Sequence, residues 1–171
     1  MKLVLNLLFS LFAACAFAGE GHSHDDGHDH EKPSGRDHMA TLGDLRLLHA
    51  WASETEDSDV LVYVEIENNS GRAVTLLGAQ ADFAARTELV GFQSQGGTSG
   101  YTRLPKLPIS AGAKMILEPK GVALRMVEVD RHLHEGDDFE FTLVFEQGEV
   151  AMTGQVEAEN ATQHSHAGHN H

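Results

Sequence analysis

Histidine is the residue type in this chain that is best suited to metal chemistry, and it is concentrated at the two ends. Nine of the twelve histidines lie there. The neutral imidazole is the commonest protein ligand for divalent transition metals. The candidate ligands, called the terminal histidines below, are His22, His24, His28, His30, His38, His164, His166, His169 and His171.

Within each end the histidines alternate with small or acidic residues. Positions 22/24 and 28/30 form two His-x-His pairs, with Asp25, Asp26 and Asp29 beside them. Positions 164/166 and 169/171 repeat the pair in a less acidic setting. A flexible segment of this kind can surround one ion with several nitrogens, and the carboxylates add oxygen ligands. Such donors suit Cu(II) or Zn(II) better than Cu(I), so we expect copper as Cu(II), with zinc as the alternative.

The other residues give no indication of catalysis. The chain contains no Gly-x-Ser-x-Gly elbow, His-Glu-x-x-His motif or phosphate-binding loop. His49 precedes Trp51 on an expected strand, and we interpret it as structural. His132 and His134 are expected in a surface turn. We therefore predict that the protein is not an enzyme and that its metal chemistry belongs to its ends.

Residues 1–18 have the features of a secretory signal peptide. Lys2 precedes a nearly continuous apolar run, and Ala16-Phe17-Ala18 fits the small-x-small cleavage pattern. The run is too short to cross a bilayer of about 30 Å comfortably as a helix. We therefore predict export to the periplasm. The alternative is a lipoprotein anchored at Cys15, the only cysteine, because residues 12–15 loosely resemble a lipobox.

The acidic balance limits the classes of partner. A formal net charge of −14 disfavours nucleic acid and anionic lipid, and it attracts cations. Taken alone, this charge is explained better by solubility than by metal binding. The expected partners are a metal ion and a periplasmic or membrane protein that receives it.

Composition divides the chain into a folded domain between two tails. Residues 19–40 consist mainly of Gly, His, Asp and Glu and cannot bury enough surface to fold, so we expect a disordered His/Asp-rich tail. Residues 159–171 are similar and form the second expected tail. The predicted domain therefore spans 41–158.

The domain has the pattern of an all-β protein. Residues 60–66 and 139–145 alternate apolar and polar side chains, and 150–156 continue the pattern after a short turn, which predicts a hairpin. Gly and Pro interrupt the runs, and helical periodicity is absent. Eight or nine short strands of this kind predict a Greek-key sandwich or barrel. Further strands are expected at 45–52, 74–79, 87–92, 114–118 and 122–129.

The order of several short motifs resembles a known family. It includes His49-Ala50-Trp51-Ala52, then Tyr63 with Asn68-Asn69, then Leu107-Pro108-Ile109, Leu117-Glu118-Pro119-Lys120-Gly121 and the strand after Gly136. Together they resemble the periplasmic copper chaperones called PCuAC over residues 45–156. The resemblance implies a cupredoxin-like β-sandwich and a copper chaperone function.

The resemblance also implies where copper ligands would lie. The family binds Cu(I) through a His-x10-Met-x21-His-x-Met pattern. Alignment on Pro119-Lys120-Gly121 places the four ligand positions at Val90, Tyr101, Ala123 and Arg125, with the spacing preserved. None of the four residues is a histidine or a methionine, so the family's Cu(I) site does not transfer to this chain.

Three functions remain open at this point. We predict a periplasmic copper chaperone or buffer that binds metal through the terminal histidines. The alternatives are a zinc-binding or zinc-buffering protein, and a metal-free interaction module built on a degenerate copper-chaperone fold.

Overall fold

A computed structural model of the chain describes residues 38–164 and shows an all-β domain in that range. No helix long and apolar enough to cross a membrane occurs among these residues. The strands are β1 (Met39–Leu42), β2 (Leu45–Ser53), β3 (Val60–Asn68), β4 (Val74–Gln80), β5 (Ala84–Gln95), β6 (Thr98–Arg103), β7 (Leu107–Ile109), β8 (Lys114–Ile116), β9 (Val122–Val129), β10 (Asp138–Phe145) and β11 (Gly148–Glu157).

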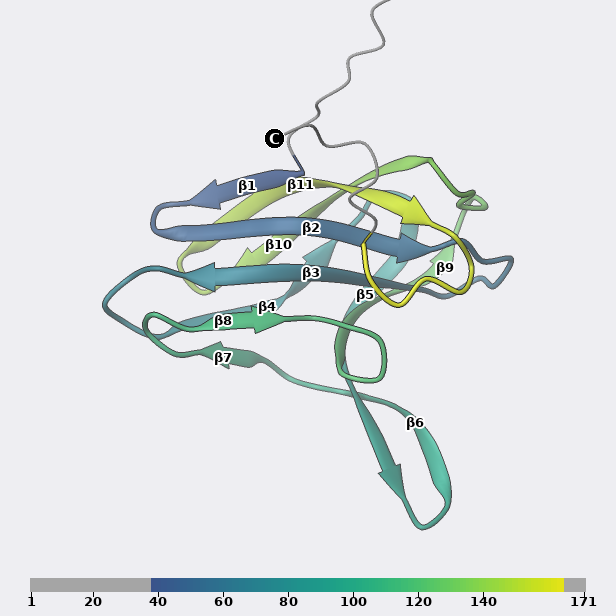
Figure 1. Ribbon diagram of the computed structural model, residues 1–171, viewed down its shortest axis with the longest axis horizontal. Coiled ribbons are helices and arrows are strands. Elements are labelled where there is room, and N and C mark those ends of the chain that lie inside the picture. Colours follow the sequence, from purple (N-terminus) through teal and green to yellow (C-terminus); the bar gives the residue numbers. More distant parts are fainter. Residues whose placement is uncertain (1–37, 165–171) are drawn as a thin grey trace, which may run out of the picture. The chain divides into compact units, whose positions relative to one another are not determined.

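The strands form one continuous hydrogen-bonded sheet that curls onto itself. Its order is β6-β5-β9-β3-β2-β11-β10-β4-β7, while β1 pairs with β2 and β8 pairs with β3. Strands far apart in this order, such as β3 and β4, contribute to the same core through Val64 and Leu76. The curled sheet therefore encloses its apolar face as a sandwich does. Figure 1 shows the hairpin of β5 and β6 extending away from this body.

Alternating side chains build the core as the sequence predicts. Val60, Val62, Val64 and Ile66 of β3 are at most 2% exposed. The predicted hairpin of β10 and β11 is also confirmed, with Phe141 opposite Met152 in its register. The all-β sandwich expected from the sequence is therefore confirmed within the described residues.

The structure adds elements that the sequence did not predict. Strands β1, β6 and β7 had no predicted counterpart. Strand β1 begins at Met39, inside the segment 19–40 that was expected to be a tail. The predicted signal peptide, the rest of that tail and residues 165–171 lie outside the described residues.

The turn after β3 is fixed by one buried amide. Asn68 is 1% exposed, and its Nδ2 donates to the carbonyl oxygens of Arg72 and Ser110 at 2.8 and 2.9 Å. Its Oδ1 accepts from the Ser70 hydroxyl at 2.6 Å. A buried polar side chain is tolerated when its hydrogen bonds are satisfied, as they are here. The Asn-Asn-Ser-Gly turn thus joins β3 to the start of β4 and to the loop after β7.

Gly154 of β11 lies against the ring of Phe139 in the core. A Cβ atom at this position would lie 2.3 Å from Cζ of Phe139, whose side chain is 1% exposed. Gly154→Ala should therefore lower the free energy of unfolding by about 1–3 kcal/mol, as overpacking does in dense cores. Urea denaturation measures the change.

Gly71→Ala is the matched control, because its Cβ would meet no atom within 4 Å. Adding Phe139→Leu to Gly154→Ala should restore part of the lost stability. Equal stability of the two alanine variants would contradict the packing of Phe139 against Gly154.

Candidate metal centre

Strand β2 brings the two ends of the described domain together. The first half of β2 pairs with β1, with Met39 opposite Leu48. The second half of β2 pairs in parallel with β11 along the same edge, with Gln155 opposite Trp51, while β3 occupies the other edge of β2. The strand therefore exchanges one partner for the other between Leu48 and Trp51, and both ends of the domain are held there.

His49 lies at this exchange point in an unusual backbone conformation. Its φ is 52°, in the left-handed region that non-glycine residues seldom adopt. The register between β2 and β3 shifts here, since Leu48 faces Glu65 but Trp51 faces Tyr63. One extra residue on β2 makes this a β-bulge, a feature that re-aims side chains. The backbone N–H of His49 donates to the carbonyl oxygen of His38 at 3.0 Å.

The segment after β11 returns to the same place. The Glu54 N–H donates to the Glu157 carbonyl oxygen at 2.7 Å, which fixes the end of β11 beside β2. A turn follows, closed by the bond from Ala161 N–H to the Ala158 oxygen at 2.9 Å. Figure 1 shows this segment turning back across β2 and β3. His164 is thereby brought to the surface of β2, where it is 6% exposed.

Three histidines meet at this point. The ring centroid of His164 lies 5.7 Å from that of His38 and 5.6 Å from that of His49. Nδ1 of His164 lies 2.7 Å from Oε1 of Glu157. We call these three histidines, with Glu157, the histidine cluster. It joins one residue before β1, one on β2 and one beyond β11.

A pocket of about 310 Å³ borders the histidine cluster. Its lining includes His49 and His164, the indole of Trp51, and the acidic residues Glu65 and Glu118. Glu65 forms an ion pair with Lys114, in which Nζ and Oε1 lie 2.5 Å apart. The pocket thus combines imidazole nitrogen, carboxylate oxygen and an aromatic wall, which are groups that bind cations.

The described residues place two of the nine terminal histidines. His38 and His164 are brought together, and the other seven lie outside the described range. Within residues 38–164, no three His, Cys, Asp or Glu side chains form a group already arranged to hold a metal ion. Sequence reasoning did not include His49, which was interpreted as structural. Its position next to His38 and His164 depends on strand register and on the return of the chain, which no local motif reveals.

His132 and His134 lie away from the histidine cluster on the polar turn after β9. Their side chains are 63% and 65% exposed. Nδ1 of His132 lies 3.6 Å from Glu56, and Nδ1 of His134 lies 3.6 Å from Asp137. This agrees with the surface turn expected from the sequence.

The positions that the PCuAC resemblance assigns to copper ligands lie close together. Val90 and Ala123 are paired across β5 and β9, and both are 0% exposed. They form a small apolar cluster with Trp51 and Tyr63, against which Tyr101 packs. These five side chains offer no imidazole or thioether.

The phenol of Tyr63 in this cluster is harder to ionise than an exposed tyrosine, because its pKa is raised. Burial raises the pKa of Tyr63 above its ordinary value of 10.0, and neighbouring Tyr101 adds to the shift. The Tyr101 hydroxyl accepts a hydrogen bond from the Lys120 N–H at 2.9 Å. The side chains at these positions pack as an apolar cluster.

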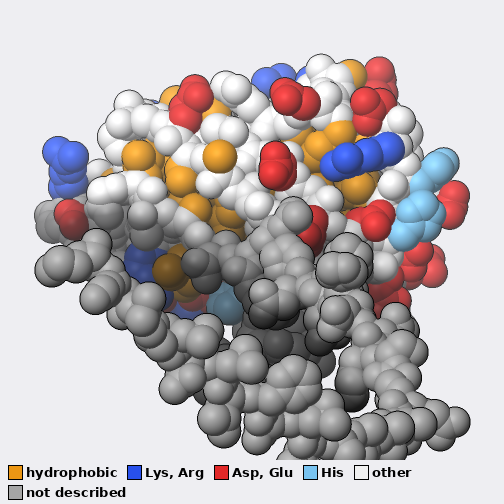
Figure 2. Space-filling view, turned by 90° about the horizontal axis from the view of Figure 1, so that it is seen from above, with side chains coloured by type: hydrophobic (Ala, Val, Ile, Leu, Met, Phe, Trp, Pro, Cys, Tyr) orange, Lys and Arg blue, Asp and Glu red, His pale blue; other side chains and the backbone are white. Residues whose placement is uncertain are grey.

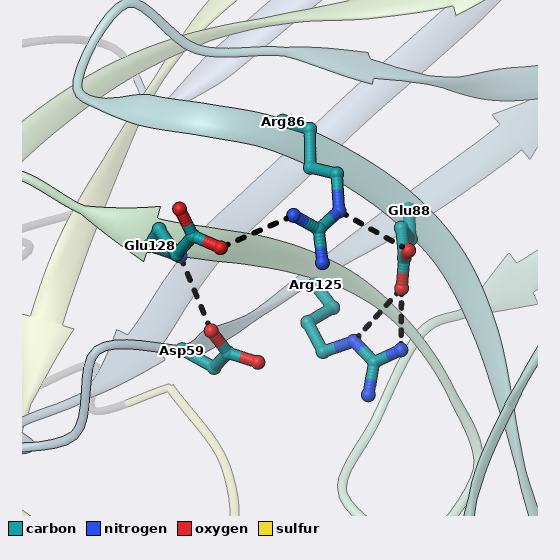
Figure 3. Close-up of polar contacts among 5 residues, drawn as sticks. All are labelled: Asp59, Arg86, Glu88, Arg125 and Glu128. Carbon is teal, nitrogen blue, oxygen red and sulfur yellow. Dashed lines mark hydrogen bonds and ion pairs between the residues drawn. The ribbon is translucent and has the colours of Figure 1, made fainter.

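Arg125, at the fourth of these positions, is held in a network of charges (Figure 3). Its Nε donates to Oε2 of Glu88 at 3.1 Å, and its Nη2 forms an ion pair with the same oxygen. Arg86 lies between Glu88 and Glu128, with its Nη1 3.3 Å from Oε1 of Glu128. The hydrogen bond from Arg125 is the main reason that the pKa of Glu88 is lowered. Partial burial opposes this shift, while the positive charges of Arg125 and Arg86 add to it.

Comparison with known proteins identifies the fold and a family. The family model LpqE-like, a lipoprotein family, matches residues 45–158. No curated protein matches the chain.

Several solved structures resemble the domain. The PCuAC domain from PmoF2 matches in its apo form with a TM-score of 0.62 and 21% identity, covering 74% of this chain and 99% of that chain. Its copper-bound form matches with a TM-score of 0.60 and 21% identity over 71% and 98% of the two chains. Apo-DR1885 from Deinococcus radiodurans matches with a TM-score of 0.54 and 19% identity, covering 88% of this chain and 99% of that chain. At these identities the likeness shows the fold, which is the predicted cupredoxin-like sandwich.

The lowered pKa of Glu88 predicts how its contribution to stability depends on pH. A carboxylate whose folded-state pKa is depressed stabilises the fold above its ordinary pKa of 4.5, and this stabilisation disappears as the pH falls through the folded-state pKa. Glu88→Gln should therefore lower the free energy of unfolding by about 1 kcal/mol at neutral pH. The difference from the unaltered protein should vanish in strong acid, as measured by urea denaturation at several pH values.

Glu128→Gln is the control, because Glu128 is 67% exposed and its partner Arg86 is 57% exposed. Its effect at neutral pH should be smaller. A Glu88→Gln effect that stayed constant from neutral pH into strong acid would contradict a charge-based contribution.

Proposed function

We propose that this chain, which belongs to the LpqE-like lipoprotein family, binds copper through its terminal histidines as a chaperone or buffer. Two kinds of observation support the proposal. The domain has the fold of PCuAC domains, one of which was solved with copper bound. The terminal histidines supply metal ligands that the residues at the family's copper positions lack.

The observation that carries the proposal is the meeting of the two ends at the histidine cluster. His38 and His164 are the first described histidines of the two ends, and their rings lie 5.7 Å apart. The two ends of the described domain, to which the other terminal histidines are joined in sequence, therefore lie side by side. Ligands from the two ends can then reach the same ion without a long loop closure, which lowers the entropic cost of binding.

The available donors favour Cu(II) over Cu(I). Met39 is the only methionine in the two predicted tails, 19–40 and 159–171, and its Sδ lies 3.8 Å from Nη2 of Arg46. Imidazole and carboxylate groups remain, and they suit Cu(II) and Zn(II). Zinc buffering is therefore the second candidate function, favoured by the same donor set. A metal-free interaction module is the third.

The protein surface and the family name support a role outside the cytoplasm. Figure 2 shows acidic side chains on the visible part of one face of the domain, and acidic groups attract cations. The lipoprotein family name supports export, in agreement with the signal peptide proposed at residues 1–18. Periplasmic location is our proposal, with anchoring through Cys15 as the alternative. The metal would then pass to a periplasmic or membrane protein.

Replacing the terminal histidines tests the proposed function. A full-length variant with all nine changed to asparagine should lose most of its capacity for Cu(II), because its imidazole donors are removed. Equilibrium dialysis with metal analysis measures the number of ions bound. The control changes His132 and His134 to asparagine, which should leave the capacity unchanged. Undiminished binding by the nine-residue variant would show that the metal site lies elsewhere.

Competition among metals separates the three candidate functions. We expect the full-length chain to bind Cu(II) more tightly than Zn(II), since the affinity of nitrogen and oxygen sites follows that order, and to bind Cu(I) weakly. Titration against chelators of known affinity for each ion measures this. Tight Cu(I) binding would contradict the proposed ligand set. Weak binding of all three ions would favour the interaction module.

A further inference from the structure

We propose that a groove between β4 and β5 is a docking site for an extended acidic segment of a partner protein. The groove has a volume of about 280 Å³ and is lined from β4, β5 and the end of β6. The bound segment places an apolar side chain against Leu77 and a carboxylate beside Arg103. This interaction goes beyond the proposed function, because it does not depend on a metal ion.

The groove lies at a seam in the curled sheet. Strand β5 pairs with β9 and β6, and β4 pairs with β10 and β7, but within the described domain β4 and β5 do not pair with each other. Two hydrogen bonds nevertheless fix the walls of the groove. The Thr87 hydroxyl donates to the carbonyl oxygen of Ala79, and the Leu104 N–H donates to the carbonyl oxygen of Leu89 at 2.8 Å. The groove is thus formed before a partner binds, which lowers the entropic cost of binding.

A β-bulge presents Leu77 to this groove. The register of β4 and β10 shifts here, since Phe145 faces Leu76 but Val144 faces Gly78, so that Leu77 is the extra residue. A bulge re-aims the side chain that it carries. Leu77 is 42% exposed and is one of three large apolar side chains exposed on the described domain. An apolar side chain of the partner would remove this leucine from water.

The next residue, Gly78, leaves backbone uncovered in the groove. A Cβ atom at this position would meet no atom within 4 Å. Glycine inside a strand often marks a place where another backbone approaches closely. Leu104 and Pro105 provide further apolar lining. An extended peptide fits these features because it offers peptide groups to the uncovered backbone and an apolar side chain to the leucines.

Local charge determines which kind of segment fits. Residues 89–117 contain no aspartate or glutamate, although the chain has 26 acidic residues. Arg103 lines the groove and has no ion-pair partner among the described residues. Glu88 also lines it, but its carboxylate is already paired with Arg125 and Arg86 (Figure 3). A carboxylate beside Arg103 therefore gains an attraction that the acidic remainder of the surface does not offer.

The two ends of the groove differ in charge, which orients the bound segment. One of the two hydrogen bonds that fix the walls is next in sequence to Gln80, and the other is next to Arg103, so these residues mark the two ends. The amide Nε2 of Gln80 lies 3.5 Å from Oε1 of Glu149. A carboxylate at the Gln80 end would be repelled by Glu149. The segment therefore binds with its carboxylate at the Arg103 end.

The test uses the full-length chain without added metal and two synthetic six-residue peptides. The acidic peptide has a central Leu-Val pair with two Asp or Glu residues on each side, and the neutral peptide has Asn or Gln in their place. Binding is followed by NMR at about 0.15 M salt, where charges more than about 8 Å apart are largely screened. The amide signals of Leu77, Gly78 and Leu104 should shift. The acidic peptide should bind about threefold more tightly than the neutral one, which corresponds to one exposed ion pair.

Two variants and two matched controls locate the binding. Leu77→Ala should weaken binding of both peptides by about fivefold, because apolar contact is lost. Arg103→Gln should abolish the preference for the acidic peptide. Ile116→Ala removes another exposed apolar side chain, 49% exposed on β8, and Arg72→Gln removes another exposed arginine. Both controls should bind like the unaltered protein, and urea denaturation checks that all four variants are folded.

Several results would overturn the inference. The absence of shifts at the groove with millimolar peptide would refute the docking site, and a preference for the acidic peptide that survived in Arg103→Gln would refute the role of its charge. Self-association in sedimentation velocity that Leu77→Ala abolished would assign the groove to a second copy of the chain. Shifts with decanoate but with neither peptide would assign it to a small amphipathic carboxylate. None of these results affects Cu(II) binding in dialysis, so the proposed function is tested separately.

Discussion

The pairing of strand β2 with both ends of the domain is the constraint on which the candidate site depends. One side of β2 accepts β1 along its first half and β11 along its second half. Two strands can share one side only if the first ends where the second begins, and the bulge at His49 lies at that point. The backbone hydrogen bonds of the sheet, rather than side-chain contacts, therefore determine that the ends of the domain are adjacent.

This arrangement gives a physical meaning to the histidine-rich composition. Two ligand segments attached to opposite sides of a domain would bind ions independently, and each would lose entropy separately. Segments that begin side by side have a high effective concentration for each other. His38 and His164 are such a pair, with ring centroids 5.7 Å apart. The structure thus places the two ends of the described domain side by side.

The sequence allowed much of the fold to be predicted and only part of the site. Alternating apolar residues predicted β3 and β10 because their side chains face the core on every second residue. Strand β6 was missed because its sequence, Thr98–Arg103, is polar and mostly exposed. The terminal histidines were recognisable from composition. The position of His49 beside His38 and His164 could not be predicted from the sequence, because it depends on a bulge and on pairings between residues distant in sequence.

The histidine cluster also lies close to the positions where the PCuAC resemblance places copper. Trp51 borders the pocket of His49 and His164, and it packs in the apolar cluster that contains Val90 and Ala123. At the fourth position, Arg125 brings a positive charge that Glu88 neutralises. Arg125 thus puts a paired guanidinium at a position that the family pattern assigns to methionine. The pocket of His49 and His164 and the positions that the resemblance assigns to copper ligands therefore share one side chain, the indole of Trp51.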